Sequence, residues 1–117
     1  MVRHFGDGTR EDTISEHILH HRGTTLVRRL RLAPGESTAW HRDPFHRVTV
    51  VLSGEILAIE YRDEAQGERF RGTAGQADWD EPTGRVHRAI NIGEQAYEEV
   101  TIFFLDRPDA VPQPKTE

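Results

Sequence analysis

The chain has 117 residues, a formal net charge of −5 and no cysteine. A chain of this length can bury one sizeable core, so we expect a single domain. Basic and acidic residues are interspersed, which argues against nucleic acid as a partner, and the missing cysteines exclude disulfides and thiolate chemistry. Neither a leader-like apolar segment nor a run of eighteen apolar residues occurs, so we expect a cytoplasmic protein without membrane partners.

The first 23 residues are polar and rich in Gly, Asp and His, and we expect residues 1–23 to form an arm outside the core. Three histidines in it, His17, His20 and His21, would cluster only on a helix, and we favour a solvated arm. From residue 24 the period changes to two, which is typical of a half-buried strand. One face of that strand would carry Leu26, Arg28, Leu30 and Leu32.

Short apolar runs then recur along the chain, separated by Gly, Pro and Asn turns. The expected strands are 48–52, 56–61, 77–79, 86–91 and 99–105. The first two would form a hairpin around the turn at Gly54. Short strands without a long helix favour an antiparallel sandwich or barrel, which we place at residues 24–106. Residues 107–117 are rich in proline and are expected to form a tail.

Two segments carry Gly, Pro, His and Asn at fixed spacings. Residues 34–54 read PGESTAWHRDPFHRVTVVLSG, and residues 75–91 read GQADWDEPTGRVHRAIN. Together they resemble the two conserved motifs of the cupin family. The resemblance departs at two positions, because Asp43 stands where the family has its second His and Arg47 stands at the acidic position. One extra residue also lies between Gly75 and Pro82.

The resemblance covers roughly residues 24–105 and implies an all-β fold, the antiparallel double-stranded β-helix or jelly-roll cupin barrel. It also implies a small-molecule ligand in the barrel and a homodimer. The motif glycines are most simply turn residues, and Asn91, at the end of a strand, is expected to stabilise a turn.

Three residues of these motifs form a candidate metal site. Side chains two apart on a strand point the same way, so His41 and Asp43 would face one metal together, and His87 would join from the second motif. Two histidines and one carboxylate suit a divalent ion such as Fe, Mn, Ni or Zn and leave positions open. The plainer alternatives are structural histidines and, for Asp43 before Pro44, a turn residue.

Two neighbouring residues leave an alternative open. A one-residue bulge would turn His46 inward as a further metal ligand. Without that bulge, Arg47 faces inward with Thr49 and Val51 and would favour a carboxylate ligand. Arg28 is a second candidate anchor for an anionic substrate if its face lines the barrel, and otherwise an interface residue.

Two functions therefore remain open. The favoured one is a mononuclear metal enzyme, dioxygenase-like or an isomerase, that acts on a small oxygen-bearing molecule; its catalytic residues are not identified by the sequence. The alternative is a non-catalytic module with a degenerate or absent metal site, which holds a small anionic ligand through Arg47, His41 and His87. A barrel that serves mainly to pair with itself or another protein is the least specific interpretation.

Overall fold

A computed structural model of the chain describes residues 4–5, 10–11, 15–63 and 66–106, with side chains described from residue 15 onward. The described residues form β-strands and turns, and none of them belongs to a helix that could cross a membrane. The strands are β1 (His4–Phe5), β2 (Arg10–Glu11), β3 (Glu16–Arg22), β4 (Thr25–Leu32), β5 (His41–Asp43), β6 (His46–Ser53), β7 (Ile56–Tyr61), β8 (Glu68–Arg71), β9 (Ala77–Asp80), β10 (Thr83–Asn91) and β11 (Tyr97–Phe104).

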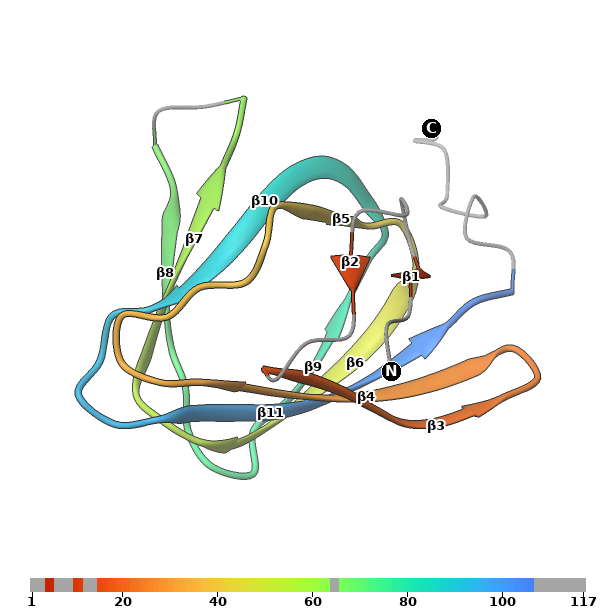
Figure 1. The fold of residues 1–117 in the computed structure, drawn as a ribbon, viewed down its shortest axis with the longest axis horizontal. Helices are drawn as coiled ribbons and strands as arrows, with labels where there is room; N and C mark the ends of the chain where they lie inside the picture. The colour runs from red at the N-terminus through yellow and green to blue at the C-terminus, as the bar shows by residue number, and fades with distance from the viewer. Residues whose placement is uncertain (1–3, 6–9, 12–14, 64–65, 107–117) are drawn as a thin grey trace.

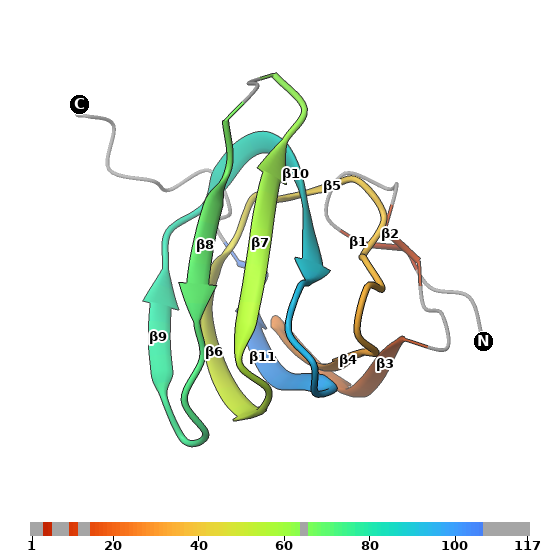
Figure 2. The same cartoon turned by 90° about the vertical axis from the view of Figure 1, so that its left-hand side faces the viewer.

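Two antiparallel sheets make up the barrel. The five-stranded sheet has the order β3-β4-β11-β6-β9, and the four-stranded sheet has the order β5-β10-β7-β8. They face one another across the molecule, as Figures 1 and 2 show from two sides. The small β1-β2 pair lies beside them (Figure 2). The predicted all-β, two-sheet architecture is confirmed.

Strand alternation separates the inner face of each strand from its outer face. In β4 the predicted inner face is confirmed, because Leu26, Arg28, Leu30 and Leu32 are all buried. An apolar cluster fills part of the interior and consists of Leu30, Leu32, Val51, Leu57, Ala89 and Tyr97. The rest of the interior is polar, with buried histidine, carboxylate, arginine and threonine side chains. Since charged groups are rarely buried without partners, this polar half marks the place to look for a site.

The predicted hairpin of residues 48–52 and 56–61 is wrong. Strand β6 pairs with β11 and β9, whereas β7 pairs with β10 and β8, so the two strands belong to different sheets. Gly54 turns the chain from one sheet to the other with a φ of 109°, in the region that favours glycine. Local sequence could not distinguish these cases, because a hairpin and a corner between sheets both need a tight turn.

The barrel extends into the expected arm. Strand β3 pairs with β4 along residues 16–22, so the structure places part of the segment 1–23 in the five-stranded sheet. Its alternation is concealed because the side chain that it buries is Glu16 rather than an apolar one. His17, His20 and His21 are exposed, as expected of solvated residues. The expected tail, 107–117, lies outside the described residues.

Asn91 holds a turn, as predicted. Its amide Nδ2 donates to the carbonyl oxygens of Leu32 (2.9 Å) and Gln95 (2.8 Å), and its Oδ1 accepts from the amide of Gly93 (2.9 Å). The side chain is fully buried. It therefore ties the end of β10 to the end of β4 and to the turn that leads into β11.

Candidate metal centre

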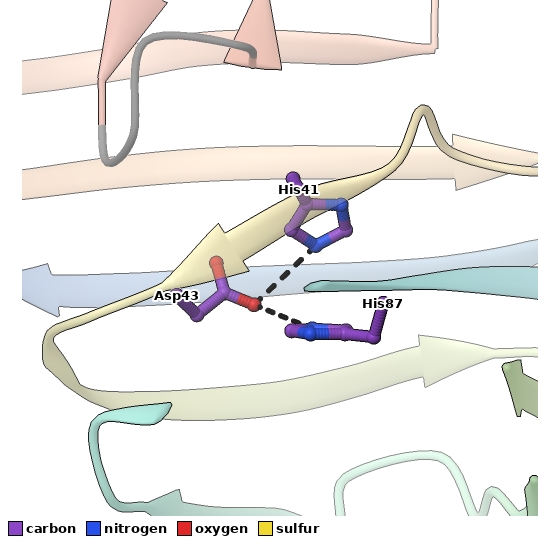
Figure 3. A group of neighbouring side chains, drawn as sticks. All are labelled: His41, Asp43 and His87. Atoms are coloured by element: carbon purple, nitrogen blue, oxygen red, sulfur yellow. Dashed lines mark hydrogen bonds and ion pairs between the residues drawn. The ribbon is translucent and has the colours of Figure 1, made fainter. Parts of the chain in front are cut away.

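Three buried side chains meet on the inner face of the four-stranded sheet. His41 and Asp43 lie two residues apart on β5 and point to the same side, and His87 comes from the neighbouring strand β10. The β5–β10 register places His87 directly opposite His41. Figure 3 shows one oxygen of the Asp43 carboxylate pointing toward both imidazole rings. The structure thus brings together the first three predicted ligands.

Backbone carbonyls orient both imidazole rings. Nδ1 of His41 lies 2.7 Å from the carbonyl oxygen of Ala39, and Nδ1 of His87 lies 2.9 Å from that of Arg85. A carbonyl can only accept a hydrogen bond, so each Nδ1 must carry the proton. In the neutral rings, Nε2 is then the atom with the free lone pair. Metal-binding histidines are usually held in this way by a hydrogen bond from the second nitrogen.

The two Nε2 atoms converge on one carboxylate oxygen. Oδ2 of Asp43 is 3.1 Å from Nε2 of His87 and 3.4 Å from Nε2 of His41 (Figure 3). The donor atoms of all three residues lie within 4.8 Å of one another. For metal–ligand bonds of about 2.1 Å, adjacent donors in octahedral or tetrahedral geometry are roughly 3.0–3.4 Å apart. The two distances from Asp43 to the histidines match this spacing, and the three residues together could hold a divalent metal ion.

The three residues line a cavity of about 660 Å³ between the sheets. Its apolar lining includes Leu30, Val51 and Leu57. Thr49 and Thr101, on neighbouring strands of the five-stranded sheet, add hydroxyl groups. A volume of this size accommodates a small organic molecule beside a metal ion.

His46 does not join the group, so the prediction of it as a fourth ligand is not met. The pairing of β6 with β11 runs without a bulge at this point, with Arg47 opposite Phe103 and His46 opposite Phe104. Regular alternation therefore sends His46 to the outer face. There its ring packs 5.6 Å from that of Trp79, and its Nδ1 lies 3.2 Å from a carboxylate oxygen of Glu81.

Arg47 lines the cavity, as expected for a strand without a bulge, but one nitrogen of its guanidinium, Nη1, is already bonded. Nη1 donates to the carbonyl oxygens of Glu81 (3.1 Å), Phe45 (3.2 Å) and Asp43 (3.4 Å). These bonds tie the turn between β5 and β6 to the end of β9. Arg47 accordingly stabilises the turn that follows Asp43, and a carboxylate substrate would have to compete with three carbonyls for its Nη1.

Arg28 is buried inside the barrel and is neutralised there. Its Nη2 donates to Glu99 Oε2 at 2.6 Å and to Thr101 Oγ1 at 3.0 Å, while Nη1 lies 3.5 Å from Glu16 Oε1. Its Nε has no hydrogen-bond acceptor among the described residues. Two carboxylates therefore already balance the charge of the predicted anion anchor.

Sequence reasoning missed the acidic members of the cavity wall. Glu99 accepts a 2.6 Å hydrogen bond from the hydroxyl of Tyr97, and burial, with Glu99 nearby, raises the pKa of Tyr97. Asp78 and Asp80 reach the cavity from β9, which pairs with β6 so that Asp80 stands opposite Arg47. The same period-two pattern that identified β4 would have placed Glu99 and both aspartates on the inner faces of their strands.

Known structures share this architecture. A cupin domain from Bordetella pertussis is 24% identical, with a TM-score of 0.67, over 75% of this chain and 88% of that one. A predicted oxalate decarboxylase from Thermotoga maritima is 20% identical, with a TM-score of 0.57, over 77% and 78% of the two chains. The polyketide cyclase RemF from Streptomyces resistomycificus is 18% identical, with a TM-score of 0.58, over 80% and 66%. No family model matches the chain, and neither does any curated protein.

The chain has the cupin fold, the double-stranded β-helix that its two motifs suggested. At these identities the likeness defines the fold, and the chemistry has to be argued from the site itself.

Proposed function

We propose that this protein is a cupin-fold metalloprotein in which His41, Asp43 and His87 bind one divalent metal ion facing the cavity. The observation that carries the proposal is the convergence of two Nε2 atoms on Asp43 Oδ2, with both Nδ1 atoms committed to backbone carbonyls. Without a proton or a cation between them, two lone pairs would face a carboxylate oxygen, which is unfavourable in a buried site.

The proposed activity is a dioxygenase-like or other metal-assisted reaction on a small oxygen-bearing molecule. Two histidines and one carboxylate are the donor set of non-haem iron oxygenases, and a metal bound there supplies Lewis-acid polarisation of a ligand oxygen. The chain's own residues hold the two rings in place, and Val51 and Leu57 give part of the cavity wall an apolar surface. The fold also occurs in a polyketide cyclase and a predicted oxalate decarboxylase, so it does not select the reaction.

A module that binds a ligand without metal is the second candidate. It is favoured by the His–Asp–His contact, which would also be stable with one imidazole protonated. Its anion-binding form is weakened by Arg28 and Arg47, because both are engaged within the protein. Homodimer formation and a cytoplasmic location stay predictions from the sequence.

Metal analysis of the purified, untagged protein tests the proposal. After anaerobic reconstitution with Fe²⁺, Mn²⁺, Ni²⁺ or Zn²⁺ and removal of excess ion, we expect about one ion per chain for at least one metal. His87→Ala should lose it, whereas His46→Ala should retain it, because His46 is a histidine of the same barrel on the outer face. Circular dichroism checks that both variants fold. An unmodified protein without metal, or equal metal in the two variants, would refute the site.

A further inference from the structure

The five-stranded sheet presents carboxylates to the cavity across from the candidate metal group. Asp78 and Asp80 come from β9 and Glu99 from β11, while the metal group lies on the four-stranded sheet. Each carboxylate has a different set of partners, and this difference decides what the cavity can accept.

Two of these carboxylates have donors. Glu99 receives hydrogen bonds from Arg28 (2.6 Å), Tyr97 (2.6 Å) and Thr101 (2.9 Å). Asp78 accepts one hydrogen bond, from Nε2 of Gln76 at 2.9 Å, and it is exposed, so water can supply its remaining donors.

Asp80 is different. It is partly buried, and within residues 15–63 and 66–106 no side chain donates a hydrogen bond to its carboxylate or forms an ion pair with it. Arg47 stands opposite it in register but directs Nη1 to three carbonyl oxygens. Burial raises the pKa of Asp80; Arg47 lowers it, and nearby carboxylates raise it further. Asp80 is thus an acceptor that faces the cavity without a donor.

The cations of the cavity offer little to an anionic ligand. Arg28 and Arg47 are engaged as described above. Arg85 stacks on the ring of Tyr61, 3.6 Å from its centroid, and lies 3.4 Å from Asp63. Arg71 also lines the cavity, but it is exposed on β8. An organic carboxylate in the cavity would meet the negative charge of Asp80, whereas Arg28, Arg47 and Arg85 already contact acceptors of the protein.

We propose that the cavity takes a small organic cation, a molecule with an ammonium group and an oxygen function, and that Asp80 is the residue that selects it. The ammonium group donates to the Asp80 carboxylate, and the oxygen function faces the group of His41, Asp43 and His87. The second half of this inference rests on the proposed function. A charge-assisted hydrogen bond in a partly buried site discriminates strongly between an ammonium and a carboxylate.

Matched pairs of probes test the ligand class. Tyramine and 4-hydroxyphenylacetate share a phenol and differ in their charged group, and 3-aminopropan-1-ol and 3-hydroxypropionate form a smaller pair. Binding to Zn²⁺-treated protein is measured by ligand-observed NMR and calorimetry at neutral pH. We expect at least one amine to bind, and Asp80→Asn to weaken it about tenfold or more. Asp106 is an exposed aspartate outside the cavity, so Asp106→Asn should leave the affinity for the amine unchanged.

Three results would overturn the inference: no amine binding at millimolar concentration, amine affinity that survives Asp80→Asn, or weakening by Asp106→Asn to the same degree. Zinc content is measured on the same samples. Zinc bound without amine binding defeats this inference and leaves the metal proposal standing. Amine binding that depends on Asp80 in protein that holds no zinc defeats the metal proposal and supports the ligand class.

Discussion

Replacement of Arg28 by methionine should destabilise the barrel strongly. Arg28 and Glu99 form a 2.6 Å ion pair in which the side chains are 4% and 10% exposed, and Glu16 is a second buried carboxylate 3.5 Å from the guanidinium. Arg28→Met would leave both carboxylates buried without their cation. Loss of one partner of a buried pair costs about 3–5 kcal/mol of unfolding free energy. For a domain of this size, that corresponds to a fall in melting temperature on the order of 10–20 °C.

The neighbouring residue provides a matched control. Arg29 pairs with Glu98 between the same two strands, but on the outer face, where its side chain is 44% exposed. Arg29→Met should lower the unfolding free energy by no more than about 1 kcal/mol. Urea unfolding followed by tryptophan fluorescence measures both variants, and Arg28→Lys, which keeps the charge, covers the case in which Arg28→Met does not fold. Equal costs for the two methionine variants would refute the assignment of Arg28 to a buried ion-pair network.

Three further predictions concern single positions. Gly54→Ala should lower the unfolding free energy by about 2 kcal/mol or more, and by more than Gly75→Ala does. Both glycines have positive φ, but only a Cβ at position 54 would lie 2.8 Å from a backbone atom, the Cα of Tyr97. Equal urea midpoints for the two variants would contradict this. Asn91→Ala removes three hydrogen bonds of a buried side chain and should lower the unfolding free energy by about 2–4 kcal/mol in the same assay. The pKa of Asp80 is raised above 3.8 in the folded state, so its ionisation opposes folding as pH rises. Asp80→Asn should therefore stabilise the protein at pH 7 but not below about pH 3.8. A stabilisation independent of pH would show that ionisation is not its cause.

The parts of the fold that local patterning determines were predictable. Alternating residues identified β4 and its inner face, and the motif spacing brought His41, Asp43 and His87 to one site. His46 and Arg47 were distinguishable only by whether β6 contains a bulge, and a bulge depends on the pairing with β11 rather than on β6 alone.

The remaining differences come from tertiary context. Strand β3 lies at the edge of the sheet, and its buried side chain is Glu16. Its sequence therefore lacks the apolar alternation that would have predicted a strand. Likewise, Arg28 was placed on the correct face, but its charge could be judged only after Glu99 was found beside it. A sequence can show that an arginine faces inward, whereas its availability to a ligand depends on residues that the fold brings from elsewhere.

The pairing of β5 with β10 determines when, during folding, the candidate metal site of His41, Asp43 and His87 forms. Asp43 and His87 are 44 residues apart in sequence, and they meet only after β10 has docked beside β5. Closing so long a loop is entropically costly, and such non-local pairings slow folding. A site assembled from them is absent from the unfolded chain, so a metal ion that recognises it would bind the native state selectively and shift the folding equilibrium toward it. If the site forms after the folding transition state, bound metal would act chiefly by slowing unfolding. The fraction of chains that hold a metal ion would then measure the fraction in which the barrel has closed.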